Sequence, residues 1–173
     1  MQLAARDNGW AQFAAMENHY NLLYREDERE LIPICRQMNV SLMPYSPLAA
    51  GHLTRPEWNA DSVRSRTDRA AIGKYDRTQK QDVEIVRRVH TLAEKYGVKM
   101  QQIALAWEWA KGVTAPIIGA TKAFHFDDAA GAFSVKLSEE DIRFLEEPYV
   151  PHRIVGAVDC NPPEGTKLLD EKK

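Results

Sequence analysis

Short apolar segments alternate along this chain with stretches suited to helix, and this order constrains the fold more than any other feature. Residues 13–17, 40–45 and 114–119 are short and apolar, which is typical of buried strands. Strands separated by helices pair in parallel, because each crossover returns the chain to the same end of the sheet. The order predicts an α/β fold with three parallel strands. Three strands do not close a barrel, so this pattern fits a piece of a barrel or a small open fold.

Helices are expected in five segments, from apolar periodicity and from capping signals. These segments are 26–39, 79–96, 100–111, 123–133 and 139–146. Gly97 suits the left-handed residue that follows the second of them. Ser138 and Asp141 have the spacing of a capping box at the start of the last. Trp107 is expected in the core rather than against a ligand.

Composition and charge indicate neither a nucleic-acid nor a membrane partner. The formal net charge is −2, which gives no general attraction to nucleic acid or anionic lipid. The first residues lack a signal-peptide pattern, and no stretch approaches the roughly 18 apolar residues of a membrane span. Cys35 and Cys160 match no metal spacing, and Cys35 shares an expected apolar helix face with Leu31, Ile34 and Met38. Cys35 is expected as a buried reduced thiol, and a cytoplasmic location fits these features.

The stretch from 46 to 78 is long, irregular and locally basic. Its basic residues include Arg55, Arg64, Arg66, Arg69, Lys74 and Arg77. Loops of this length in compact domains are often lids, or else disordered. Two interpretations remain open here, a solvated loop and a flap that contacts an anion.

Ligands of α/β folds gather at the carboxyl ends of strands, and a group of polar or small residues follows each strand here. Residues 17–21 carry amides that could bond a ligand amide, or that form a polar turn. In 45–53, the tyrosine could stack on a flat ring and small residues could admit phosphate, or the segment is a tight turn. In 119–122, Lys122 and a helix start could bind an anion, or Thr121 caps the helix.

No residues have the spacing of a familiar catalytic or metal site. The five histidines show no HExxH pattern, and neither a Ser-His-Asp set nor a persuasive carboxylate pair is present. We therefore expect no catalytic residue and no metal site.

Three runs, taken together in order and spacing, resemble the aldo-keto reductase superfamily. They are NHYNLLYRE at 18–26, PYSPLA at 44–49 and IIGATK at 117–122. The closing run LEEPYVPH at 145–152 resembles bacterial members. The similarity extends from about residue 9 to residue 156, nearly the whole chain.

This resemblance implies a partial (β/α)8 TIM barrel, made of the last three strands with their helices. Residues 1–157 would form this C-terminal part of the barrel, and 158–173 a polar tail. Members of the family bind NADP(H) and reduce aldehydes and ketones by hydride transfer. A small-molecule carbonyl substrate is thus implied once the missing half completes the barrel, with neither nucleic acid nor membrane as a partner.

The resemblance also assigns cofactor-binding roles by position. Glu17 and Asn18 would lie by the nicotinamide carboxamide, and Tyr45 would stack on the nicotinamide ring. The pyrophosphate would be lined by Ser46, Leu48, Gly51 and Leu53. The stretch from 46 to 78 would close over the cofactor as a lid.

At the adenosine end, Thr121 and Lys122 would hold the 2′-phosphate, the feature that favours NADPH over NADH. His125 and Asp128 would flank the adenosine. The same runs add two more residues to the cofactor-binding set, Pro47 and Gly119.

Three residues depart from the family pattern, namely Glu17 in place of Gln, Ala50 in place of Arg and Ala129 in place of Asn. The family's catalytic Asp, Tyr, Lys and His belong to the first half of the barrel, and no segment here matches them. Without that Tyr a chain would hold a cofactor but have no general acid. A reductase fragment, a non-catalytic NADP-binding or interaction module, and a product without stable function all remain open. Open strand edges predict self-association.

Overall fold

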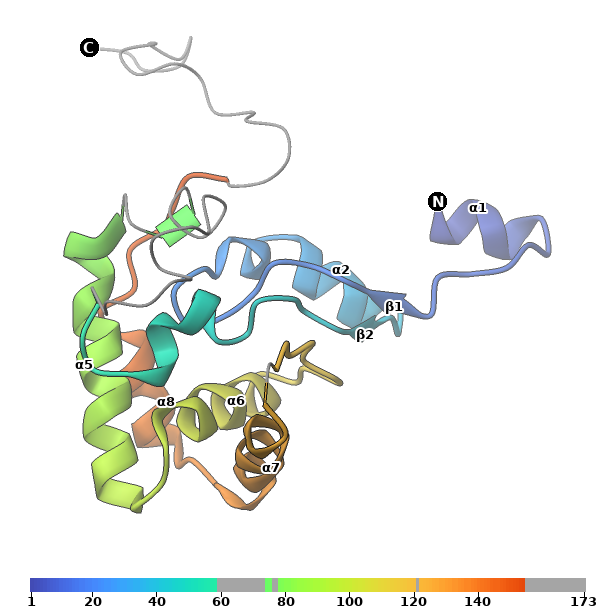
Figure 1. Ribbon diagram of the computed structural model, residues 1–173. Helices are drawn as coiled ribbons and strands as arrows, with labels where there is room; N and C mark the ends of the chain where they lie inside the picture. The colour runs from blue at the N-terminus through green and yellow to red at the C-terminus, as the bar shows by residue number, and fades with distance from the viewer. Residues whose placement is uncertain (59–73, 76–77, 121, 155–173) are drawn as a thin grey trace, which may run out of the picture.

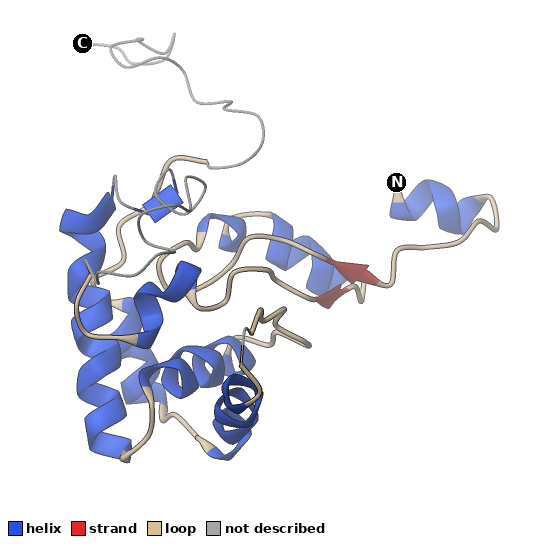
Figure 2. Cartoon of the chain, in the orientation of Figure 1, coloured by secondary structure: helices blue, strands red, loops and turns tan. Residues whose placement is uncertain are grey.

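The computed structural model describes residues 1–58, 74–75, 78–120 and 122–154 (Figure 1). The expected tail at 158–173, most of the basic stretch between 46 and 78, and Thr121 lie outside these residues. In the described part, helices and loops flank one short pair of strands (Figure 2). No helix of that part is long and apolar enough to cross a bilayer.

Helices make up about half of the described chain. In order they are α1 (Gln2–Asp7), η1 (Glu26–Glu28), α2 (Leu31–Gln37), η2 (Ala49–Thr54), α5 (Gln79–Tyr96), α6 (Met100–Ala110), α7 (Phe124–Gly131), η4 (Ala132–Ser134) and α8 (Glu139–Glu146). The bounds expected for α5 and α8 are confirmed, and those of α6 and α7 differ by one or two residues. The helix α1 has no counterpart among the expected elements.

The single helix expected at 26–39 is wrong, because these residues divide into η1 and α2. Pro33 accounts for the late start of α2, since its ring would clash with the carbonyl four residues earlier in a continuous helix. The expected apolar face is wrong in one residue, since Ile34 is exposed while Ile32 is buried. Cys35 is buried with a free thiol, as predicted.

The two strands, β1 (Ala15–Met16) and β2 (Ser41–Leu42), pair in parallel as the sequence predicted. An isolated parallel bridge from His19 to Tyr45 continues their register. Both strands are shorter than the expected 13–17 and 40–45. The residues of the two strands lie opposite one another in order, Ala15 against Ser41 and Met16 against Leu42.

The third expected strand, 114–119, is reduced to one parallel bridge between Tyr45 and Ile117. The amide of Ile117 donates to the carbonyl of Pro44 at 2.8 Å. Pro44 has no N–H group, which removes one ladder donor between the residues after β2 and this segment. Three parallel segments therefore lie side by side in chain order, but regular strand geometry is confined to two of them.

One face of this sheet packs on the core and the other is open. Met16 and Leu42 pack into the main hydrophobic core. Phe13, Ala15 and Glu17 alternate with Met16 along the chain and are all exposed. Successive side chains of a strand point to opposite faces, so Glu17 belongs to the open face.

The core lies where α5 packs against both α6 and α8. Trp107 of α6 is completely buried there, which confirms its expected place. Gly97 ends α5 with φ at 64°, in the left-handed region, as predicted. The same core cluster includes Ile85, Val89, Ile103 and Leu145.

The capping box predicted for α8 is present. The amide of Asp141 donates to Ser138 Oγ at 3.1 Å, and the amide of Ser138 donates to Asp141 Oδ2 at 3.1 Å.

We expect Ser138→Ala to lower the free energy of unfolding by about 1 kcal/mol, because the amide of Asp141 loses its acceptor. Urea unfolding measures this loss against Ser134→Ala, an exposed serine of η4. Equal stabilities of the two variants would contradict it.

Candidate cofactor-binding site

The carboxyl ends of the three parallel segments lie together, as the sequence predicted. The amide of Tyr45 donates to the carbonyl of Asn18 at 2.9 Å, and Tyr45 bridges Ile117 on its other side. Glu17 precedes Asn18, and Gly119 follows Ile117 by two residues. One edge of the sheet therefore brings the residues predicted to lie by the nicotinamide close to the start of the segment that leads to α7.

Tyr45 lies on the open face of the sheet with Glu17. Its half-buried ring stacks on His19, with the ring centres 5.2 Å apart and the planes inclined by 9°. Lys74 Nζ lies 4.7 Å from the centre of the Tyr45 ring. Burial raises the pKa of the Tyr45 hydroxyl, and the carboxylates of Asp27 and Glu17 raise it further. The residue therefore stays neutral and offers ring surface rather than a proton.

Asn18 is buried at the carboxyl end of β1. Its Nδ2 donates to Asp27 Oδ2 at 2.8 Å. Its Oδ1 is also buried and has no hydrogen-bonding partner among the described residues. Because the carboxylate holds the nitrogen, the oxygen is left to accept from some other donor. A ligand amide N–H would satisfy it.

His19, Asn21 and Tyr75 form a buried cluster behind this edge, which the sequence analysis missed. His19 Nε2 lies 2.7 Å from Tyr75 Oη, and Asn21 Nδ2 donates to Tyr75 Oη at 3.1 Å. Asn21 Nδ2 also lies 2.9 Å from the carbonyl of Ser46. Burial, followed by the charge of Lys74, lowers the pKa of His19 to about 3. The cluster therefore holds the loop after β2 with an uncharged imidazole.

The loop after β2 has left-handed backbone at several residues. The φ angle is 57° at Ser46, 48° at Ala49, 55° at Ala50 and 101° at Gly51. Such conformations cost about 1 to 3 kcal/mol at each non-glycine residue and persist where the surroundings enforce them, commonly at ligand sites. The amide of Gly51 donates to the carbonyl of Leu48 at 2.8 Å, which closes the turn.

Two of the predicted cofactor-binding residues after β2 are buried. Pro47 is buried, and the side chain of Leu53 is completely buried in the core. The amide of Leu53 donates to the carbonyl of Leu48 at 3.4 Å. The side chain of Leu53 therefore packs into the core, and the place of Leu53 along the pyrophosphate stays a prediction. The other three residues predicted to line the pyrophosphate, Ser46, Leu48 and Gly51, are partly exposed.

The third predicted group lies before α7. Gly119 is exposed, and a Cβ atom added there would meet nothing within 4 Å. Lys122 is exposed, with Nζ 5.6 Å from the centre of the Phe124 ring. Open space and a cation therefore occur together at this position.

A cavity of about 570 Å³ lies beside α7. It is lined by Thr54, Pro56, His90, Ala93, Glu94, Gly97, Val98, Lys99, Met100, Gln101, Phe124, His125 and Asp128. Only His125 and Asp128 among the predicted site residues belong to this lining. The predicted residues thus divide between the strand ends and the cavity, and sequence reasoning missed Lys99 and Phe124.

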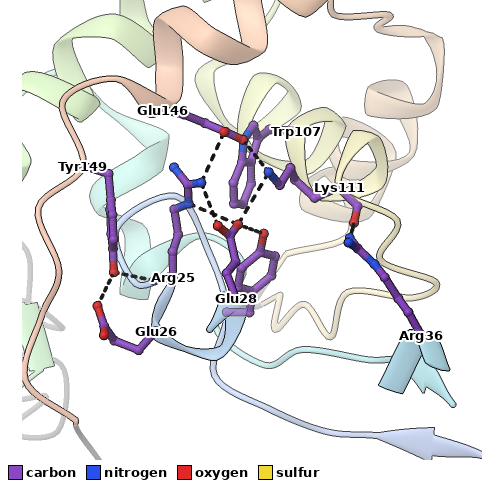
Figure 3. Close-up of polar contacts among 9 residues, drawn as sticks. Arg25, Glu26, Glu28, Arg36, Trp107, Lys111, Glu146 and Tyr149 are labelled. Atoms are coloured by element: carbon purple, nitrogen blue, oxygen red, sulfur yellow. Dashed lines mark hydrogen bonds and ion pairs between the residues drawn. The ribbon is translucent and has the colours of Figure 1, made fainter. Parts of the chain in front are cut away.

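A polar network holds the segment after β1 against α6 and α8 (Figure 3). The Arg25 guanidinium donates to both oxygens of Glu28, at 3.2 and 2.8 Å, and to Glu146 at 3.2 Å. Trp107 Nε1 donates to Glu146 at 2.9 Å, and Lys111 Nζ lies 2.9 Å from the same carboxylate. The network therefore joins three elements that are far apart in the sequence.

Two tyrosines complete this network. Tyr149 Oη accepts from the amide of Arg25 and donates to Glu26, both at 2.8 Å, while Tyr20 Oη donates to Glu28. Burial alone would raise the pKa of Glu28, but the hydrogen bonds from Arg25 and Tyr20 outweigh it, and the pKa lies below its ordinary value. The charges of the network are mutually satisfied, as befits a structural role.

The sequence pattern of the aldo/keto reductase family matches residues 1–149. The chain belongs to the aldo/keto reductase family. It is 42% identical over 155 residues to versiconal hemiacetal acetate reductase of Aspergillus parasiticus, a similarity that covers 89% of this chain and 45% of that protein. It is 45% identical over 162 residues to a Schizosaccharomyces pombe protein named as an aryl-alcohol dehydrogenase, covering 91% and 44%.

This aldo/keto reductase chain also resembles the crystal structure of a thermostable aldo-keto reductase in complex with the inhibitor epalrestat. The TM-score is 0.55 at 26% identity, over 76% of this chain and 38% of that one. The chain spans less than half the length of the two curated relatives. Those relatives are fungal, so the similarity to bacterial members stays a prediction.

The two curated relatives of this aldo/keto reductase chain are named as a dehydrogenase and a reductase, and both names denote oxidoreductases. Over residues 1–58 and the other described ranges, no three His, Cys, Asp or Glu side chains gather as metal ligands would.

Proposed function

We propose that this chain is the C-terminal, cofactor-binding part of an NADP(H)-dependent aldo/keto reductase. In this proposal its parallel segments are the last three strands of a (β/α)8 TIM barrel, within residues 1–157. The family match and the chain-order pairing of the three segments support it. The length of the chain relative to its relatives also supports it.

The unpartnered Oδ1 of Asn18 carries the proposal. It is a buried acceptor at the carboxyl end of β1 with no hydrogen-bonding partner among the described residues, and a buried polar group without a partner calls for an explanation such as a ligand. Nicotinamide carries a carboxamide whose N–H₂ is a matching donor. The neighbouring ring of Tyr45 and the open space at Gly119 fit the remaining parts of a dinucleotide.

When bound, NADPH supplies the hydride that reduces a carbonyl carbon. The residues of this chain bind and orient it: Asn18 accepts from the carboxamide, and Tyr45 covers the nicotinamide ring. Asp27 fixes the orientation of the Asn18 amide. The loop at 46–51 admits the pyrophosphate, and Lys122 with Thr121 meets the adenosine 2′-phosphate.

The proposal assigns no catalytic residue to this chain. A general acid works best with a pKa near the working pH, whereas burial raises the pKa of Tyr45 and of Tyr75 and lowers that of His19. We expect the proton donor of the whole reductase to be a residue other than Tyr45, Tyr75 or His19.

The substrate is a small carbonyl compound, and the name of one relative favours testing aromatic aldehydes first. A cytoplasmic location and self-association stay predictions.

We expect the purified chain to bind NADPH saturably and more tightly than NADH, as read by tryptophan fluorescence and by calorimetry. Tyr45→Ala should weaken NADPH binding about tenfold, because aromatic stacking of this kind contributes roughly 1 to 3 kcal/mol. Phe133→Ala is the matched control, since Phe133 is an exposed aromatic residue that stacks on Trp109 and is not one of the predicted cofactor-binding residues.

Absence of NADPH binding in a cooperatively folded sample would overturn the proposal. Equal losses in Tyr45→Ala and Phe133→Ala would show that Tyr45 does not contact the cofactor. Binding without oxidation of NADPH by any aldehyde would favour the alternative of a non-catalytic NADP-binding module.

A further inference from the structure

Two lysines from distant parts of the sequence flank one exposed aromatic ring. Lys99 Nζ lies 6.0 Å and Lys122 Nζ 5.6 Å from the centre of the Phe124 ring. Phe124 is 51% exposed, and the His125 ring meets it edge-on with the centres 4.5 Å apart. A flat ring between two ammonium groups suits a ligand that combines a heterocycle with an anion.

The adjoining cavity has the size for such a ligand. Its volume of about 570 Å³ lies within the range of roughly 300 to 1,000 Å³ that small-molecule sites occupy. Lys99, Phe124, His125 and Asp128 all line it. Lys122 approaches the same Phe124 ring from the segment before α7.

Lys99 is restrained within this cavity by a single carboxylate. Its Nζ lies 2.6 Å from each oxygen of Asp128. The side chain of Lys99 is largely exposed, whereas that of Asp128 is mostly buried. Because the ammonium group of Lys99 is largely in contact with solvent, its pairing with Asp128 is weakened by screening, and an incoming phosphate can compete with Asp128 for it.

We propose that Lys99 is a second ligand of the adenosine 2′-phosphate and a determinant of the preference for NADPH over NADH. The adenine lies against Phe124, and the phosphate lies between Lys99 and Lys122. Asp128 competes with the phosphate for Lys99 and thereby limits affinity. This inference rests on the proposed binding of NADP(H), and it adds a residue from the turn between α5 and α6 to the expected set.

The test compares NADPH with NADH, and 2′,5′-ADP with 5′-AMP, by calorimetry on the full chain. We expect Lys99→Met to weaken NADPH and 2′,5′-ADP about tenfold, because a charge-assisted bond to phosphate is lost, and to leave NADH and 5′-AMP within twofold. Lys99→Arg should retain the preference. Asp128→Asn should tighten 2′,5′-ADP about threefold, since it frees Lys99. Lys136→Met, an exposed lysine outside the cavity, is the control.

The outcomes distinguish the role of Lys99 from the binding of NADP(H) itself. Equal weakening of NADPH and NADH by Lys99→Met, or no weakening of either, overturns the role of Lys99 while leaving cofactor binding intact. Failure of the unmodified chain to bind any of the four ligands overturns the proposed function and this inference with it. Circular dichroism of Lys99→Met confirms that its fold is retained, and Lys99→Arg and Asp128→Asn test the proposal independently if it is not.

Discussion

Arg25→Met is expected to lower the free energy of unfolding by about 3 kcal/mol, because it leaves two carboxylates short of their main cation. The Arg25 side chain is only 10% exposed and pairs with Glu28 and Glu146. It also lies 5.6 Å from the centre of the Trp107 ring. Lys111 remains near both carboxylates, which keeps the expected loss below that of a fully unpaired charge.

Arg87→Met is the matched control for Arg25→Met. Arg87 pairs with Glu84 on the surface of α5, and its side chain is 64% exposed. Its loss should change stability by less than about 0.5 kcal/mol. Urea unfolding of both variants gives the comparison. Similar losses in the two variants would mean that the network in Figure 3 does not hold the segment after β1 in place.

Glu108→Gln is expected to remove a strong pH dependence of stability. Glu108 is fully buried, and neither carboxylate oxygen has a partner among the described residues. Burial raises the pKa of Glu108 well above its ordinary value. The folded state therefore holds a proton that the unfolded state releases above about pH 4.5.

The sign of the effect follows from this difference in bound protons. As the pH rises from the unfolded-state pKa through the folded-state pKa, the folded chain binds more protons than the unfolded chain, so stability falls. The loss approaches about 1.4 kcal/mol per pH unit. Glu108→Gln cannot ionise, so its stability relative to the unmodified chain should rise with pH over this window.

Urea unfolding between pH 5 and pH 8 measures the stability difference between the Glu108→Gln variant and the unmodified chain. Glu57→Gln, at an exposed glutamate outside the core, should show a difference that does not change with pH. A constant difference for Glu108→Gln as well would mean that Glu108 is ionised in the folded chain.

Elements set by local interactions were the ones the sequence predicted well. The capping box of Ser138 and Asp141 and the left-handed Gly97 involve residues no more than a few positions apart. Helical periodicity is similarly local, which is why α5 and α8 have their expected bounds. The division of 26–39 into η1 and α2 also has a local cause, Pro33, but the expected single helix overlooked it.

For the candidate site, the sequence predicted which residues meet at the edge of the sheet, because the parallel order of the segments determines this. That order places Glu17, Asn18 and Tyr45 at one edge. The direction of the Asn18 amide depends on Asp27, in a different element. The burial of Leu53 depends on the packing of η2 against the core, which no spacing within the loop reveals.

The sequence by itself determined the parallel α/β order, the bounds of α5 and α8 and the family, because these follow from patterns within short stretches and from motif order. Only the tertiary structure decided that Arg25 meets Glu146 and that Lys99 meets Asp128. It also left the oxygen of Asn18 and the carboxyl group of Glu108 buried without partners in the part of the chain that the structure describes. Burial and pairing depend on what the rest of the chain brings to a side chain, and the energy of a polar group depends chiefly on that environment.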